Sequence, residues 1–461
     1  MDFNGPLRVH SRNSRYFTDE SGKAIYLTGS HTWSNLQEYE SDRPFDYDAY
    51  LDWLQRLEFN FTILHQWLSS TQARWIHGWS ENAVIVQPSF YKQVDTNKKG
   101  FPVYDLTKFN QEYFDRLRGR VVKAMDHKIY VDINFFTGWV DHGPVGWRGH
   151  PFNKENNING IDGDPEDNGN GLKVQTLEIS AITRLQEVFC QKVIDTVNDL
   201  DNIIFQLSGE SDATSTEWQY HMINYIHEYE KKKTKQHPVG MIYQWSPFTK
   251  GTNENLFQSP ADWIAPNPKA EGLYNYCYNP PPADGRKVVI LDTDHLWGIG
   301  GDGAWVWKSF LRGHNPIFMD TYDSGWVGYL DPYDTILIGE GKISPVWESA
   351  RKAMGYSRMF AERINLAEMT PHPELTYTGY CLANPGVEYL FYFPSEFMKI
   401  GQIDLTGAKG ELSVEWFNPK TGVSVVAESI TGGNKKHFTI PFEADAVLYI
   451  KSTNKIHKEL Q

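Results

Sequence analysis

Short, almost continuous apolar runs recur through the first three quarters of the chain. Eight of them are candidate strands: 24–30, 60–66, 128–135, 202–207, 238–244, 263–266, 287–291 and 316–320. Strands that are apolar on both faces are typical of a parallel sheet covered by helices. The pattern therefore predicts a parallel α/β arrangement rather than an exposed antiparallel sheet.

Helical periodicity lies between several of these runs. Segments 47–57 and 176–200 carry apolar residues at a spacing of three and four, which is the pattern of an amphipathic helix. Eight strands with intervening helices fit a (β/α)8 TIM barrel better than an open doubly wound sheet. No glycine-rich phosphate-binding fingerprint follows any of the strands, which argues against a nucleotide-binding fold.

The pattern changes near residue 365. A last helix is expected to begin at Ser344 and Pro345, a cap residue followed by proline. After it come seven short β-type runs separated by turns: 380–383, 388–393, 401–405, 412–417, 423–428, 436–440 and 446–450. Such spacing predicts an antiparallel β-sandwich. We expect a catalytic barrel over residues 1–364 and a β-sandwich domain over residues 365–461.

The charge and composition of the chain favour some classes of binding partner and disfavour others. The net charge of −14 disfavours nucleic acid and anionic membranes, and no apolar run is long enough to span a bilayer. The 3 cysteines are too scattered for a disulfide framework. The N-terminal residues lack a signal-peptide pattern, which favours a cytoplasmic location. The 16 Trp, 25 Tyr and 25 Phe favour a carbohydrate partner, because aromatic rings stack on the C–H faces of sugars.

Carboxylates follow two of the predicted strands directly. Glu210 comes after the run 202–207, and Asp292 and Asp294 follow the run 287–291. In a barrel enzyme the chemistry is located at the carboxyl ends of the strands. Cleavage of a glycosidic bond needs two carboxyl groups, one as proton donor and one as nucleophile or base. We therefore expect Glu210 to act with Asp292 or, alternatively, with Asp294, and we expect no cofactor.

Aromatic and hydrogen-bonding residues gather at the same strand ends. A pocket with convergent polar groups is the usual form of a small-ligand site. The candidate substrate-binding residues are His31, Trp33, His65, Trp67, Asn134, Trp139, His142, Gln244, Trp245, His295 and Trp297. The expected partner is an oligosaccharide, and the oligomeric state stays open.

Two other functions are compatible with these residues. One is a barrel that binds glycans without catalysis. The other is a metal-dependent barrel hydrolase, with a zinc site built from His31, His65, His295, Asp292 and Asp320. The first strand offers only one histidine where amidohydrolase-type barrels carry a His-x-His pair, which disfavours the metal site. The acidic segment 162–168 is faintly similar to a calcium loop but lacks its distal glutamate.

Several stretches resemble a known family. The order of strands with Glu210 after the fourth resembles clan A glycoside hydrolases. The segments Val193-Ile-Asp-Thr-Val-Asn198 and Trp416-Phe-Asn-Pro-Lys-Thr-Gly422 look like the apiosidase-like branch of that clan, in which a barrel precedes a small β-sandwich. The resemblance implies that Glu210 is the general acid/base and that Asp292 occupies the place of the nucleophile. It also implies retention of the anomeric configuration, although inversion stays open.

The chain departs from the family pattern in three places. Gly209 stands where an asparagine usually precedes the acid/base, and the arginine typical of the second strand is absent from Asn60-Phe-Thr-Ile-Leu-His65. The nucleophile position holds an aspartate in place of glutamate.

Two long segments, 68–104 and 138–174, follow the second and third strands. We expect them to enclose the active site and leave a pocket for terminal sugars.

Overall fold

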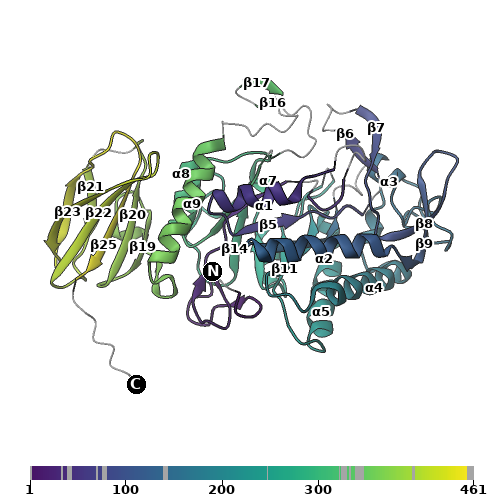
Figure 1. Ribbon diagram of the computed structural model, residues 1–461, viewed down its shortest axis with the longest axis horizontal. Coiled ribbons are helices and arrows are strands. Elements are labelled where there is room, and N and C mark those ends of the chain that lie inside the picture. The colour runs from purple at the N-terminus through teal and green to yellow at the C-terminus, as the bar shows by residue number, and fades with distance from the viewer. Residues whose placement is uncertain are drawn as a thin grey trace.

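The computed structural model describes residues 3–32, 35–38, 44–68, 71–74, 80–138, 144–246, 248–320, 322, 330–331, 334–337, 347–396 and 400–453. Of these, residues 71–74, 80–85, 144–145, 330–331 and 334–337 are described by their backbone alone. The chain forms a closed parallel barrel, followed by antiparallel sheets that pack against one side of it (Figure 1).

Eight parallel strands close the barrel in the order β10-β11-β12-β13-β14-β15-β4-β5. They are β4 (Gly29–His31), β5 (Phe61–Leu64), β10 (Tyr130–Thr137), β11 (Ile203–Gly209), β12 (Val239–Ile242), β13 (Trp263–Ala265), β14 (Val288–Asp292) and β15 (Asn315–Met319). The last strand closes the sheet by pairing with the first, Ile317 lying opposite Gly29. Each predicted strand has its counterpart here, so the predicted (β/α)8 barrel is confirmed.

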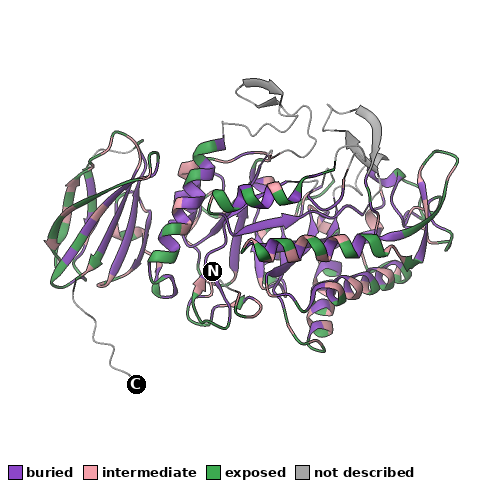
Figure 2. Cartoon of the chain, viewed as in Figure 1, coloured by how far each residue is buried: buried purple, intermediate pink, exposed green. Residues whose placement is uncertain are grey.

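Helices surround the barrel and present exposed outer faces to solvent (Figure 2). Their bounds are α1 (Tyr47–Arg56), α2 (Gln111–Asp126), α3 (Pro144–Arg148), α4 (Ser180–Val197), α5 (Thr216–Glu230), α6 (Asn253–Gln258), α7 (Thr293–Leu296), α8 (Gly303–Leu311) and α9 (Glu348–Arg363). The helix α1 begins where the Asp46 carboxylate accepts the backbone N–H of Ala49 at 3.0 Å. The helix expected from Ser344 onward is α9, and Ser344 and Pro345 themselves lie outside the described residues.

The interior of the barrel has an apolar lower part and a polar upper part. Because side chains alternate along a strand, every second residue points inward. Toward the N-terminal ends these inward residues form one apolar cluster that includes Phe61, Tyr130, Ile204, Val288 and Ile317. Toward the C-terminal ends the same faces carry His31, His65, Asp132, Asn134, Gln206 and Asp292, all of which are buried. This polar layer is the floor of the candidate site.

The C-terminal part is an antiparallel sandwich. A sheet in the order β18-β19-β20-β25-β22-β23 faces the pair β21-β24. The strands are β18 (Thr370–Pro371), β19 (Cys381–Asn384), β20 (Glu388–Phe393), β21 (Ile400–Asp404), β22 (Glu411–Asn418), β23 (Val423–Thr431), β24 (Lys435–Thr439) and β25 (Ala446–Ser452). The seven predicted strands are all present. The division at residues 364 and 365 stays a prediction.

The sandwich and the barrel share a packed interface on α8 and α9. The ring of Trp307 in α8 stacks on Tyr392 in β20 at a centroid distance of 6.2 Å, and Phe360 in α9 meets Phe417 edge-on at 5.2 Å. Trp416 is buried within the sandwich and does not form a sugar platform on its surface. These contacts favour a structural role for the sandwich.

The first long insertion forms two hairpins, and the second insertion packs on it. The first contains the pairs β6 (Thr71–Arg74) with β7 (Ser80–Ile85) and β8 (Tyr91–Thr96) with β9 (Pro102–Phe109). The second insertion binds it through Tyr104, whose N–H donates to the carbonyl of Asn156 at 2.8 Å. The hairpin β6-β7 lies on the upper side of the barrel in Figure 1.

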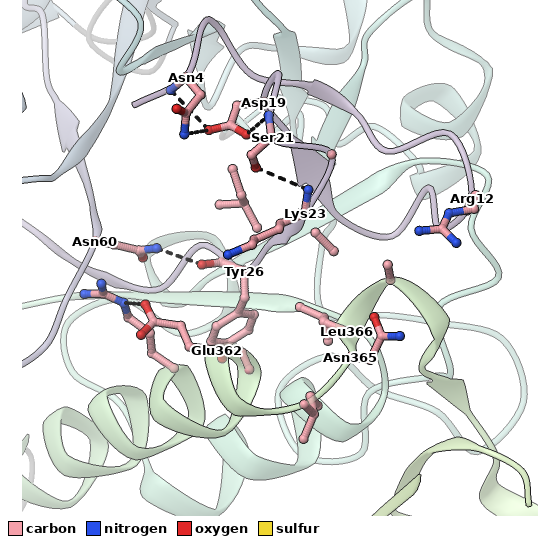
Figure 3. A pocket seen from close by; sticks show the side chains of 17 residues that line it. Asn4, Arg12, Asp19, Ser21, Lys23, Tyr26, Asn60, Glu362, Asn365 and Leu366 are labelled. Carbon is pink, nitrogen blue, oxygen red and sulfur yellow. Dashed lines mark hydrogen bonds and ion pairs between the residues drawn. The ribbon is translucent and has the colours of Figure 1, made fainter. Parts of the chain in front are cut away.

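The N-terminal end of the barrel is covered by a small sheet, β1 (Arg8–Val9), β2 (Phe17–Thr18) and β3 (Ala24–Ile25). Between this sheet and α9 lies a cavity of about 770 Å³ (Figure 3). Polar groups in its lining form hydrogen bonds: Asp19 accepts the side-chain amide of Asn4 at 3.2 Å, and Asn60 donates to the backbone carbonyl of Tyr26 at 2.8 Å. Within the described part of the chain, no helix is long and apolar enough to span a membrane.

Candidate active site

A cavity of about 370 Å³ opens at the C-terminal ends of the barrel strands. It is lined by His65, Trp67, Asn134, Thr137, Gln206, Gly209, Glu210, Tyr243, Trp245, Asp294, His295, Leu296, Trp297, Gly298, Ile299 and Met319. The predicted residues among them are His65, Trp67, Asn134, Glu210, Trp245, Asp294, His295 and Trp297. The predicted Trp33, Trp139 and His142 lie outside the described residues.

Glu210 follows β11 directly and has an unusual backbone. Its φ of 45° lies in the left-handed region, which costs a non-glycine residue energy and recurs at functional sites. The side chain keeps 23% of its surface exposed, more than His295 and Asp292 do at 4% and 3%. Gly209 before it places no side chain between Glu210 and the floor of the cavity.

Asp292 ends β14 and lies below the cavity wall. Its Oδ1 accepts the Nε2–H of His31 at 2.9 Å and the backbone N–H of Asp294 at 3.0 Å. The Nδ1 of His31 in turn is 2.8 Å from Nε2 of His65, which does line the cavity. A hydrogen-bonded chain therefore runs from the buried carboxylate through His31 to the cavity.

The protonation states of this chain follow from burial and charge. Burial alone would raise the pKa of Asp292, but the charge and hydrogen bond of His31, together with the charge of His295, outweigh it and lower the pKa to about 2. Burial and the adjacent His31 hold the pKa of His65 well below its usual value, so that His65 is neutral. Asp292 is therefore an anion, and its partner His31 donates to it.

Asp294 and His295 lie in α7, the short helix that begins after Asp292. Burial and the carboxylates of Glu210 and Asp292 raise the pKa of Asp294 to about 7, against the opposing charge of His295. Burial disfavours a charge on His295, but Glu210, Asp292 and Asp294 outweigh it and raise its pKa to about 9. His295 is then an imidazolium 3.8 Å from Oε1 of Glu210 and 3.6 Å from Oδ2 of Asp292.

Several cavity residues carry no strong sequence signal. Thr137, Tyr243, Leu296 and Met319 line the cavity but have neither a charge nor a recognisable motif. Gln206 is different, because it is a polar residue in the middle of the apolar strand β11. A buried amide at a central strand position is a signal that could have found it.

Gln244, expected to bind substrate, does not line the cavity. Its amide donates to Oγ1 of Thr216 at 3.0 Å and accepts from Asn255 at 3.1 Å, which holds it on the outer side of the barrel. The strand β12 ends at Ile242, so that strand alternation no longer applies at Gln244. Its neighbours Tyr243 and Trp245 line the cavity instead.

The weaker acidic candidates have structural partners. Asp320 forms a two-bond ion pair with Arg351 of α9 at 2.7 and 2.8 Å, and both side chains are 1% exposed. In the acidic segment, Asp164 accepts the backbone N–H of Gly169 at 2.6 Å, and Glu166 pairs with Lys173. These contacts give the acids turn-forming and ion-pairing roles.

Among the residues that the structure describes, the histidines cluster around Asp292 but do not form a metal site. Both ring nitrogens of His31 are engaged, one by Asp292 and one by His65. A metal ligand needs a free nitrogen lone pair, which His31 could offer only if this chain broke. Among the described residues, no group of His, Cys, Asp and Glu has the geometry of a metal site.

Comparison with known proteins bears on this arrangement. Residues 11–160 match the family model described as "Apiosidase-like, catalytic domain". The chain resembles the apiosidase-like glycoside hydrolases. The apiosidase-like segment spans the barrel strands with His31, His65 and Asn134 and ends before Glu210, Asp292 and Asp294. The search of curated protein sequences gives no match.

Solved structures share the whole architecture. A glycoside hydrolase of family 5 from Bacteroides vulgatus has a TM-score of 0.63 at 15% identity, with 97% of this chain and 94% of that chain covered. A second structure described as a glycoside hydrolase has a TM-score of 0.59 at 13% identity, with coverages of 98% and 97%. At these identities the likeness shows the fold alone. Together with the apiosidase-like segment, it supports a glycoside hydrolase.

Proposed function

We propose that this protein is a glycoside hydrolase that removes terminal sugars from an oligosaccharide, with Glu210 and Asp294 as its two catalytic carboxyls. The observation that carries the proposal is that both line one cavity of about 370 Å³ at the carboxyl ends of the strands, together with His295. Two carboxyls in a sugar-sized cavity are the minimal machinery for glycosidic cleavage. The reaction needs no cofactor.

Glu210 is assigned the role of general acid/base. It directly follows β11, the position that the family resemblance gives to this residue, and its side chain is 23% exposed. As acid it donates its proton to the oxygen of the leaving group as the glycosidic bond breaks. As base it then takes a proton from the water that completes hydrolysis.

Asp294 is assigned the role of the second carboxyl in preference to Asp292. Asp292 is held by His31 and by the backbone of Asp294, and it does not line the cavity. Asp294 does line it, so that a carboxylate there can reach the anomeric carbon of a bound sugar. Both residues have a carboxyl group, and the choice is supported by the contact of Asp294 with the cavity.

The protonation of Asp294 changes near neutral pH. Burial and the negative charges of Glu210 and Asp292 raise its pKa to about 7. A carboxyl attacks the anomeric carbon as an anion, so that the reactive form of the enzyme is the one in which Asp294 has lost its proton.

Asp292 supports the site from below. Its charge holds His295 as an imidazolium, and its hydrogen bond orients His31 and, through His31, the neutral His65 at the cavity wall. We therefore regard Asp292 as a positioning residue for the histidines, in place of the nucleophile that the family resemblance implies.

The shape and lining of the cavity support a terminal sugar as the substrate unit. Trp67, Tyr243, Trp245 and Trp297 line it and offer ring faces for the C–H surface of a sugar. The ring of Trp297 is braced edge-on by Trp305 at 5.2 Å. A cavity of this volume holds about one ring, which favours attack at a chain end.

Retention of the anomeric configuration is the expected stereochemistry. The family resemblance favours a covalent intermediate on the carboxylate of α7, and water attacks it from the side of Glu210. Proton NMR of the first-formed anomer tests this step. An inverted first product would show that Asp294 acts as a general base rather than as a nucleophile, and the role of Glu210 as acid would be unchanged.

A screen of the wild-type protein tests the activity. Aryl glycosides and reduced oligosaccharides covering the common hexoses, pentoses and 6-deoxy sugars would be incubated with the protein, and released sugar would be measured. We expect hydrolysis of one class, with release of the terminal unit. Binding of sugars without release from any substrate would instead favour a barrel that only binds glycans.

A further inference from the structure

Asn134 and Gln206 are direct partners in the parallel ladder between β10 and β11. Both side chains point into the barrel and line the cavity, although the residues are only 1% and 2% exposed. Neighbouring strands lie about 4.8 Å apart, so that the two carboxamides stand side by side on the cavity floor. They flank Gly209, the residue directly before Glu210.

These amides lack the partners that buried amides normally have. Within the described residues, neither the oxygen nor the nitrogen of the Asn134 side chain makes a hydrogen bond. Nor is any hydrogen bond of the Gln206 amide found there. Buried polar groups are nearly always paired, because an unpaired one loses its hydration without compensation. An unpaired amide at a cavity wall is therefore a group held ready for a ligand.

Buried amides elsewhere in the barrel show the contrast. The Gln186 amide donates to the carbonyl of Val174 at 2.9 Å and accepts the indole N–H of Trp218 at 2.9 Å. The Gln37 amide donates to the carbonyl of Pro88 and accepts the N–H of Trp67. Four other buried amides, those of Asn35, Gln175, Asn202 and Gln219, leave the oxygen unpaired but donate through the nitrogen. Among the described residues, the Asn134 amide is unpaired at both atoms.

Gly209 keeps the space over the amide pair free. A Cβ at this position would lie 3.3 Å from Nδ2 of Asn134 and 3.9 Å from Nε2 of Gln206. Any side chain there would cover both amides and separate them from the cavity. The absence of a side chain at residue 209 therefore exposes the pair beside Glu210.

We propose that Asn134 and Gln206 together bind two adjacent hydroxyls of the terminal sugar, and that this amide pair is a specificity determinant of the site. A carboxamide offers both a donor and an acceptor, and a hydroxyl needs both. Two amides on neighbouring strands match two hydroxyls on neighbouring ring carbons. The inference rests on the proposed glycoside hydrolase function for the reaction, but the binding of the sugar does not depend on catalysis.

The proposal predicts that a substitution of an unpaired amide weakens sugar binding but stabilises the fold. Replacing an unpaired buried amide with an apolar side chain of similar size removes the cost of its lost hydration. Asn134→Leu should therefore raise the midpoint of thermal unfolding and weaken sugar binding together, and Gln206→Leu should weaken sugar binding. An amide with only a structural role would behave in the opposite way, because its removal would lower stability.

The experiment measures sugar binding and unfolding in parallel. Neutral hexoses and pentoses would be titrated into wild-type protein by saturation-transfer NMR, and the Kd of the best sugar would be determined for each variant. Each leucine variant should raise Kd at least about tenfold. Tyr130→Phe is the matched control, because Tyr130 lies lower on the inner face of β10 with an unpaired hydroxyl and does not line the cavity. It should leave Kd unchanged.

The deoxy analogues of the best sugar locate the contact. Removing one hydroxyl should weaken binding to the wild-type protein but have little further effect in the variant that has lost its partner amide. Should a leucine variant fail to fold, Asn134→Ala replaces it, because alanine cannot overpack the floor. Unchanged Kd values in both leucine variants, or no binding of any sugar to the wild-type protein, would overturn the proposal. Sugar binding without hydrolysis would refute the proposed reaction alone.

Discussion

His31 and Asp292, which are 261 residues apart in the chain, form a buried hydrogen bond of 2.9 Å across the top of the barrel. Both side chains are almost fully enclosed, at 0% and 3% exposure. A carboxylate in this position is committed to its histidine partner and cannot readily approach a sugar. The bond therefore gives the two aspartates at the end of β14 different roles: Asp292 supports the site, and Asp294 lies at the cavity.

The roles of the two aspartates can be separated by chemical rescue. Asp294→Ala should lower kcat roughly 10²–10⁴-fold, because it removes the group at the anomeric carbon. Azide is small enough to enter the space left by the side chain. It should attack the anomeric carbon in place of the carboxylate and restore turnover, with a glycosyl azide as the product. Asp292→Ala should lower activity as well, through the disordered histidines, but azide should not rescue it. A glycosyl azide formed by the Asp292 variant would reverse the two assignments.

The activity should rise as pH increases through about 7. The raised pKa of Asp294 means that this carboxyl is protonated below pH 7 and becomes the reactive anion above it. The profile of kcat/KM, which reports on the free enzyme, should show this ascending limb. Since the charge of His295 opposes the raised pKa, His295→Gln should move the limb to higher pH. A profile that falls between pH 6 and pH 8, roughly the range around that value, would contradict the assignment of Asp294 as the nucleophile.

Asp132 should make stability depend on pH. Burial, and then the charge of Asp292, raise the pKa of Asp132 well above its usual value, and neither of its oxygens has a hydrogen-bond partner among the described residues. A raised pKa in the folded state gives stability that is present at low pH and is lost as pH rises. Asp132→Asn should reduce this loss. Above the unfolded pKa of roughly 3.9, the free energy of unfolding of the wild type should fall more than that of the variant between pH 4 and pH 7, a range of about three units. Urea unfolding at the two pH values measures it, and a relative gain at the lower pH would refute the assignment.

The ion pair between Asp320 and Arg351 should matter for stability rather than for catalysis. Arg351→Met leaves the buried carboxylate of Asp320 without its partner and should cost about 3–5 kcal/mol of unfolding free energy. Arg118→Met is the control, because it breaks the exposed pair with Asp199 and should cost no more than about 1 kcal/mol. Denaturant unfolding compares the two, and equal costs would show that burial of the pair has no effect.

The barrel could be predicted from sequence because its strands are buried on both faces. The runs around Ile203 and Val288 are apolar without interruption, and only a covered parallel sheet requires that pattern. The short strands after Arg363 were predicted equally well, since turns separate them at regular intervals. Helix α3 and the hairpin β8-β9 have no such signal, because their packing depends on the contact between the two insertions.

The candidate site could be predicted less completely. Strand alternation places His31 and His65 inside the barrel, and Glu210 follows a strand in an obvious position. Alternation cannot distinguish Asp292 from Asp294, however, because β14 ends at Asp292 and a helical turn begins at Thr293. The same limit explains Gln244, which lies beyond the end of its strand.

The kcat/KM values of variants at Glu210 and Asp294 test the central claim most directly. On the best substrate of the glycoside screen, Glu210→Gln and Asp294→Asn should each reduce kcat/KM by roughly 10²–10⁴-fold while leaving the thermal unfolding midpoint close to that of the wild type. The side chains are nearly isosteric with the originals, so that the fold is not disturbed. If either variant hydrolysed this substrate at close to the wild-type rate, the two residues would not be the catalytic carboxyls, and the proposed mechanism would be wrong.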